Sequence, residues 1–249
     1  MSSSTTESDP EIAARADLEK IFRAAIDAVD PARLIGRAMG GESPATEQVP
    51  DLIANASQVF LLAVGKAAAS MAAEIERRVG ARIVDAIAVV PKSAPATASP
   101  ASKVRVFPSA HPIPDDSSEA AARAACEMLH ALTADDLLIV ALSGGASAMF
   151  TMPAETIPLA DKIAINQALL KAGASIRELN VVRKHLSAVK GGRLLHRCGG
   201  ARVLGLILSD VPGNDLATIG SGLTTADWSS FGDAVAVLLT QNLLGAKQF

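Results

Sequence analysis

The chain has 249 residues, a length for one large domain or two small ones, and its 49% hydrophobic and 20% charged content excludes global disorder. The net charge of −3 provides no cationic field for nucleic acid or anionic lipid, and 3% aromatics offer few base-stacking surfaces. Two cysteines, Cys126 and Cys198, are too few for a disulfide scaffold or a four-cysteine zinc site.

Residues 1–9 are polar, with neither a basic cluster nor an apolar core, so we expect a disordered tail and not a signal peptide. No apolar run approaches the ~18–20 residues that a membrane span requires. The sequence therefore predicts a cytoplasmic protein that binds neither membranes nor nucleic acid.

Apolar, strand-like runs alternate with helical patterns along the rest of the chain. In order, we expect a helix over 10–29, a short second helix that stops at Gly40 and Gly41, a strand over 58–64, a helix over 66–79, a strand over 83–90 and a Pro/Ala/Ser loop over 91–102. A strand over 103–107, a helix capped by Ser117 or Ser118 and running to 132, a strand over 137–142, helices over 158–172 and 175–190, a strand over 201–208 and a helix over 229–244 follow. This alternation predicts a parallel sheet covered by helices on both faces. In such sheets, ligands bind at the carboxyl ends of the strands.

The first strand ends at Gly65 and Lys66, at the start of a helix rich in small residues. Free backbone N–H groups and the helix dipole favour an anion there, and the lysine adds a full positive charge. The segment is not a P-loop, because Phe60 and Ala67 replace the first glycine and the Ser/Thr of that motif. The alternative is an ordinary solvated lysine.

A second strand end reads Ser143, Gly144, Gly145, Ala146, Ser147. Two glycines between serines allow backbone amides to approach a ligand closely, which is typical of a phosphate-binding loop. One alternative is a plain strand-to-helix turn. Another is a hydrolase nucleophile elbow with Ser147 as the nucleophile, although Met149 replaces the final glycine of that motif.

A cluster of basic residues lies between residues 178 and 193 of this otherwise acidic chain. Asn180, Arg183, Lys184 and Lys190 are its candidate anion-binding or substrate-binding residues. The alternative is a charged, solvated helix face. Asp210 follows the last strand, where a carboxylate could bind Mg²⁺ or accept a proton from a substrate hydroxyl. The alternative is that Asp210 belongs to an ordinary turn.

Several segments together resemble the class II glycerate 2-kinases, which older records label hydroxypyruvate reductases. The matching segments are AVGKAAASMA, AHPIPDDSSEAA, DDLLIVALSGGASAMF, ASIRELNVVRKHLSAVKGGRL, LGLILSDVPGND and IGSGLTTAD. The resemblance implies a Rossmann-like three-layer α/β/α sandwich and phosphorylation of D-glycerate at its 2-hydroxyl, with ATP and Mg²⁺. It places the active-site lysine on Lys66 and the aspartate on Asp210. No Gly-x-Gly-x-x-Gly follows a strand, so the reductase label gains no support.

The chain departs from the family pattern at its C-terminus. Family members continue into a second, smaller domain, whereas the pattern here stops at Phe249, so residues 10–249 correspond to the N-terminal domain. We therefore expect impaired turnover, with a homodimer or a separately encoded C-terminal domain as the open possibilities for a partner. A non-catalytic, ligand-binding remnant is the alternative. Smaller departures are Ala110, Asn214 and Leu223.

Overall fold

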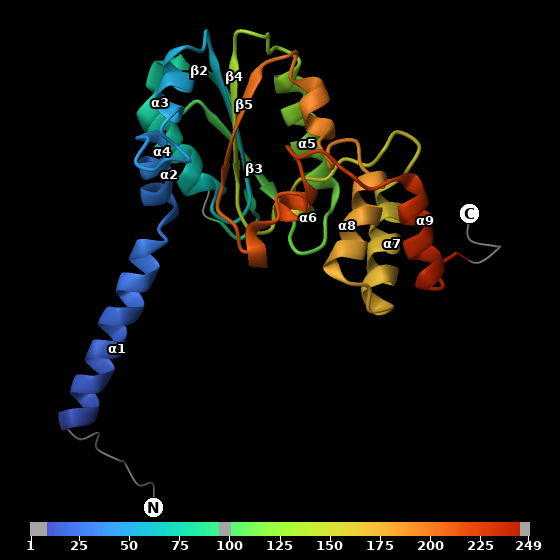
Figure 1. Ribbon diagram of the computed structural model, residues 1–249, viewed down its shortest axis with the longest axis horizontal. Coiled ribbons are helices and arrows are strands. Elements are labelled where there is room, and N and C mark those ends of the chain that lie inside the picture. Colours follow the sequence, from blue (N-terminus) through green and yellow to red (C-terminus); the bar gives the residue numbers. More distant parts are fainter. Residues whose placement is uncertain (1–8, 95–100, 245–249) are drawn as a thin grey trace, which may run out of the picture.

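The chain folds around a five-stranded sheet whose strands are all parallel (Figure 1). The computed structural model describes residues 9–94 and 101–244, so most of the expected tail and part of the loop over 91–102 lie outside the described residues. The strands are β1 (Val59–Val64), β2 (Ile83–Pro91), β3 (Val104–Ser109), β4 (Leu137–Leu142) and β5 (Arg202–Ile207). Their order is β3-β2-β1-β4-β5, and the expected α/β/α sandwich is confirmed.

Helices cover both faces of this sheet, which explains why β1 and β4 are apolar throughout and buried at every position. On one face lie α2 (Pro31–Met39), the short α3 (Val49–Ala54) and α4 (Ala68–Val79), and Met71 and Ile75 of α4 pack against the strands. On the other face lie α5 (Asp116–Leu129) and the one-turn α6 (Ala146–Met149). The chain order reverses between β1 and β4, the crevice where sheets of this type bind ligands.

Three further helices pack together beside the sheet (Figure 1). They are α7 (Leu159–Lys171), α8 (Ile176–His185) and α9 (Phe231–Thr240). Their small core consists of Leu169, Leu179, Val182, Ala234 and Leu238. Capping boxes begin two of them, Ser175 with Glu178 for α8 and Ser230 with Asp233 for α9.

Several helix boundaries differ from the sequence-based expectation, and two of the differences have identifiable reasons. Asp115, and neither Ser117 nor Ser118, caps α5, because its carboxylate accepts the N–H of Ser117. α8 ends at His185, five residues early, because the next residues contact a different segment. The Ser187 hydroxyl donates to the carbonyl oxygen of Met152 at 3.1 Å, which draws the chain away from a helical path.

The first helix, α1 (Asp9–Ala28), projects away from the sheet (Figure 1). Its helical spacing was expected, yet its apolar face is not buried by any described part of the chain. Leu18, Ile21 and Phe22 are each 67% exposed. No helix among the described residues is long and apolar enough to cross a membrane.

Candidate active site

The ends of the two central strands are joined by hydrogen bonds. The N–H of Lys66 donates to the carbonyl oxygen of Gly144 at 2.9 Å, and the N–H of Ser143 donates to Val64 at 3.0 Å. The Ser143 hydroxyl accepts the N–H of Ala67 at 3.0 Å, so this side chain fixes the start of α4. The segments after β1 and β4 therefore form one rigid unit.

The end of β5 meets the same unit at the glycine pair. A Cβ on Gly144 would lie 2.4 Å from Oδ2 of Asp210, so the Asp210 carboxylate lies against bare backbone. Gly145 has a φ of +88°, and a Cβ there would lie 2.9 Å from the imidazole of His111. Glycine is required at both positions because any side chain would displace these two polar groups.

Lys66 lies near this group but does not line the cavity described below. Its side chain is exposed. Partial burial lowers the pKa of His111, the charge of Lys66 lowers it further and the charge of Asp210 opposes both, so the three side chains share one electrostatic environment. Lys66 and Asp210, the two residues that the resemblance singles out, thus lie at the same edge of the sheet.

A cavity of about 270 Å³ opens between this edge and the helices α7 and α8. Its strand-end side includes Ser143, Gly144, Gly145, Ser147 and Asp210 from the sequence-based candidates, together with His111. Its helical side includes Asn180, Arg183 and Lys190, together with Lys162 and Asn166. Residues distant in sequence therefore converge on one chamber.

A chain of hydroxyl groups connects the two sides. The Ser221 hydroxyl donates to Oδ1 of Asn180 at 2.9 Å, so Ser147 is the donor in its own 2.7 Å bond with Ser221. The Ser147 hydroxyl thus contacts another serine and no histidine within the described chain. The serine hydrolase alternative is therefore not favoured.

Basic side chains are deeply buried on the helical side. Lys162 and Lys190 are each only 1% exposed, and their ammonium groups donate to backbone carbonyl oxygens instead of carboxylates. Burial, followed by the charge of Arg183, lowers the pKa of Lys162 from 10.5 to about 7. Burial also brings the pKa of Lys190 well below its usual value, with further lowering by Lys162 and Arg183.

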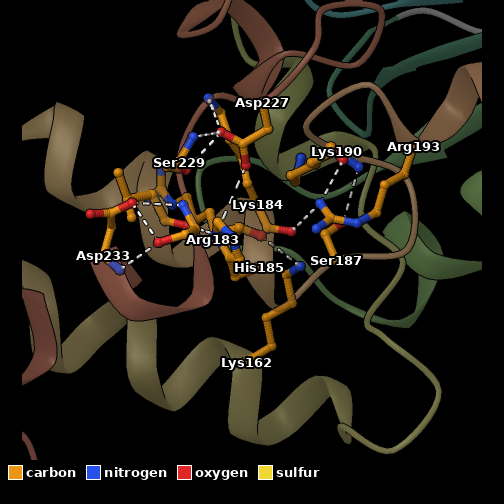
Figure 2. Close-up of polar contacts among 12 residues, drawn as sticks. Lys162, Arg183, Lys184, His185, Ser187, Lys190, Arg193, Asp227, Ser229 and Asp233 are labelled. Atoms are coloured by element: carbon orange, nitrogen blue, oxygen red, sulfur yellow. Dashed lines mark hydrogen bonds and ion pairs between the residues drawn. The ribbon is translucent and has the colours of Figure 1, made fainter. Parts of the chain in front are cut away.

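Lys184, a sequence-based candidate for anion binding, lies outside the cavity. Its ammonium lies 3.4 Å from Oδ1 of Asp227, and both side chains are under 10% exposed (Figure 2). The same carboxylate oxygen accepts the N–H and hydroxyl of Ser229. Because consecutive helical residues point about 100° apart, Arg183 lines the cavity whereas Lys184 contacts Asp227.

No group of three or more histidine, cysteine or acidic side chains that could hold a metal ion occurs in residues 9–94 and 101–244. Asp210 is the single carboxylate among the described residues that line the cavity. One carboxylate matches the usual binding of Mg²⁺, which takes one or two such ligands together with substrate phosphates and water. The single carboxylate of Asp210 is therefore compatible with a magnesium ion.

Comparison with known proteins assigns the family. The model of DUF4147, described as a domain of unknown function, matches residues 17–247. The chain belongs to the DUF4147 family. Among its relatives is a D-glycerate 2-kinase of Thermotoga maritima, 37% identical over 230 residues that make up 92% of this chain and 52% of the relative. A glycerate kinase of Homo sapiens is 35% identical over 241 residues, 91% of this chain and 46% of the relative.

A solved structure agrees with this assignment. The crystal structure of glycerate kinase from Thermotoga maritima matches this DUF4147 chain with a TM-score of 0.77 and 35% identity, covering 92% of this chain and 54% of that one. The resemblance to the glycerate 2-kinases is therefore confirmed. The chain spans about half the length of the curated relatives it matches.

Sequence patterns missed several cavity residues of this DUF4147 protein. Lys162 lies in a helix whose sequence gives no sign that a lysine is buried, and Ser221 lies in a glycine-rich turn. His111 was not among the predicted site residues. Its place after the end of β3 could have indicated the site, because β3 is parallel to its neighbours.

Proposed function

We propose that this chain forms the part of a glycerate 2-kinase that phosphorylates the 2-hydroxyl of D-glycerate at the expense of ATP. One observation carries the proposal. A single cavity at the carboxyl edge of the sheet has Asp210 and the glycine pair on one side and three basic side chains on the other. Phosphoryl transfer requires this kind of positioning and charge neutralisation and little covalent chemistry from the protein.

The strand-end side is assigned to the phosphate groups. The loop from Ser143 to Ser147 approaches the ligand through backbone that lacks side chains at two positions, and Lys66 neutralises phosphate charge. Asp210 would hold Mg²⁺, which would supply positive charge that neutralises the phosphate groups. Asp210 or the neighbouring His111 would accept the proton of the attacking hydroxyl, and the lowered pKa of His111 favours the neutral imidazole that this role requires.

The relatives are about twice as long as this chain, so we propose that the complete reaction also uses the part of the enzyme that these residues do not include. A second copy or a separately encoded domain stays the predicted partner, and the cytoplasm stays the predicted location. The chain by itself is expected to bind ligands and to turn over slowly, because half a cleft admits water and leaves developing charge unneutralised.

The test is a coupled assay with D-glycerate, ATP and Mg²⁺, and ³¹P NMR identifies 2-phosphoglycerate as the product. The chain is assayed alone and fused to the remaining half of the Thermotoga maritima glycerate kinase. We expect turnover in the fusion that Asp210→Asn lowers by on the order of 10²–10³, and little effect from Asp51→Asn, an exposed carboxylate on α3. A folded fusion without glycerate-dependent product would refute the proposal.

A further inference from the structure

The helical side of the cavity, formed by Lys162, Asn180, Arg183 and Lys190 and here named the inner wall, gathers three basic side chains without an acidic partner. Among the described residues that line the cavity, the only carboxylate is Asp210, which lies against Gly144 and forms no ion pair with these groups. Buried charges in proteins are normally paired, since desolvation is costly. The inner wall is therefore built for a negative charge that the described chain does not supply.

The two lysines of the inner wall have unused N–H donors. An ammonium has three N–H donors. Lys162 uses two, on the carbonyl oxygens of Leu186 (2.8 Å) and Arg183 (3.5 Å), and Lys190 uses two, on Ser147 (2.8 Å) and Phe150 (3.1 Å). Each protonated lysine thus keeps one donor for a ligand.

The guanidinium of Arg183 makes a hydrogen bond only through its Nε among the described residues. Its Nε donates to Oδ1 of Asn166 at 2.8 Å, and its two terminal nitrogens have no hydrogen-bond partner among the described residues. Four N–H donors of the guanidinium therefore remain available. Their fixed, planar arrangement suits the two oxygens of a carboxylate or phosphate.

Asn180 supplies an independent sign of a missing ligand. Its side chain is 96% buried, and its Oδ1 is satisfied by Ser221, yet its Nδ2 has no partner in the described chain. An unpaired buried amide is costly, and native proteins avoid one without a functional reason. Asn180 and Arg183 are three residues apart on α8 and share the face that lines the cavity.

We propose that the inner wall is an oxyanion subsite that binds the carboxylate of a small 2-hydroxy acid. The assignment of the acid as D-glycerate rests on the proposed function, whereas the subsite itself rests on the buried donors. The phosphates of ATP are assigned to the strand-end side, where Asp210 and the glycine pair lie.

Cavity size favours a small anion over a nucleotide. The volume of about 270 Å³ is below the ~300–1,000 Å³ typical of pockets for drug-sized ligands, so a three-carbon acid fits and a whole nucleotide does not. Arg183 remains protonated at any physiological pH, and its planar N–H groups match the two oxygens of a carboxylate. Inorganic phosphate has the same oxyanion chemistry, so the experiment must distinguish phosphate binding from carboxylate binding.

Carboxylate binding is expected to be linked to proton uptake. The pKa of Lys162 is about 7, and the groups that face it, Arg183 on α8, Lys190 and Arg193, are all basic. His111 and Asp210 are the other titratable groups of the cavity. A bound carboxylate favours the ammonium form of Lys162, so protons are taken up and binding weakens as the pH rises above 7.

The experiment is isothermal titration of the full chain, without ATP, at pH 8 in two buffers of different ionisation enthalpy. The titrants are D-glycerate, orthophosphate and glycerol, which replaces the carboxylate by a neutral group. Variants are Lys162→Met and Arg183→Met, and the controls are Lys171→Met and Arg177→Met, exposed residues on the same two helices. Circular dichroism verifies that each variant is folded. Because Arg183 is only half-buried, Arg183→Met keeps the test available if Lys162→Met fails to fold.

We expect D-glycerate to bind with proton uptake and glycerol and orthophosphate to bind much more weakly. Lys162→Met and Arg183→Met each weaken D-glycerate binding about 10- to 100-fold, the effect of a lost charge-assisted hydrogen bond, and the controls do not. Unchanged binding in both variants, or no binding by the folded wild-type chain, overturns the subsite. Tighter binding of orthophosphate than of D-glycerate overturns the carboxylate assignment. Binding without kinase activity in the fusion would instead reject the proposed function alone.

Discussion

The hydroxyl of Ser143, at the end of β4, accepts the backbone N–H of Ala67, at the start of α4, over 3.0 Å. This bond joins two segments separated by 76 residues and satisfies an N–H that α4 cannot satisfy itself. Gly65 is required beside it, because its φ is +127° and a Cβ there would lie 2.3 Å from the same hydroxyl oxygen. A residue that resembles a phosphate ligand in the sequence therefore has a structural role as well.

Ser143→Ala should lower the free energy of unfolding by about 1 kcal/mol, the usual effect of losing a capping group. Urea unfolding followed by circular dichroism measures the change. The matched control is Ser70→Ala on α4, since the Ser70 hydroxyl is exposed and bonds only within its own turn. Equal effects of the two substitutions would contradict the role assigned to Ser143.

The buried ion pair of Asp227 with Lys184 should matter far more than an exposed one. Asp227→Asn leaves the Lys184 ammonium buried without a counter-charge, a change that typically costs about 3–5 kcal/mol. Asp17→Asn removes an exposed pair with Lys20 at 3.0 Å and should cost under about 1 kcal/mol. Thermal unfolding of both variants compares the two pairs directly.

The Asp227 contribution should also depend on pH. Burial raises the pKa of Asp227, but hydrogen bonds from Ser229 and the charge of Lys184 outweigh it and hold the pKa below 3.8. A carboxylate with a lowered folded-state pKa stabilises the protein above its unfolded pKa, and this stabilisation disappears as the pH falls through the lowered value. The stability difference between wild type and Asp227→Asn should therefore be constant above about pH 5 and shrink below pH 3.8. A difference independent of pH would contradict the assignment.

The strands and their carboxyl ends were predictable because both depend on local sequence. Continuous apolar runs such as Leu137–Leu142 indicate a doubly covered strand, and Asp210 directly follows another strand. The inner wall was only half predictable. Arg183 and Lys184 were both predicted to bind an anion, but only Arg183 lines the cavity, because the rotation of α8 about its axis is set by packing against α7 and α9. Lys162 was missed because only tertiary structure buries it.

Helix α1 is a second case in which the sequence predicts an element but not its burial. Its periodic apolar residues predict a helix but do not say what covers them, and Ile21 and Phe22 are each 67% exposed. Phe22→Glu should therefore change the free energy of unfolding by less than about 0.5 kcal/mol. Met71→Ala, a 1% exposed side chain on α4, should cost about 2–5 kcal/mol. Similar losses in the two variants would mean that α1 packs against the folded chain.

The imidazole of His111 offers a direct measure of the candidate site, because the charges of Lys66 and Asp210 act on its pKa in opposite directions. Lys66→Ala should raise the pKa of His111, since a nearby positive charge no longer disfavours the imidazolium. Asp210→Asn should lower it, since the carboxylate that favours the imidazolium is gone. NMR titration of the histidine ring protons measures both shifts, and His111→Gln identifies the signal among the four histidines. Lys103→Ala, which removes an exposed lysine just before β3, is the control and should leave the titration unchanged. Opposite shifts in the two variants are the signature of three side chains gathered at one edge of the sheet. Shifts of the same sign, or none, would separate Lys66 from Asp210 and with it the shared site on which the proposed phosphoryl transfer depends.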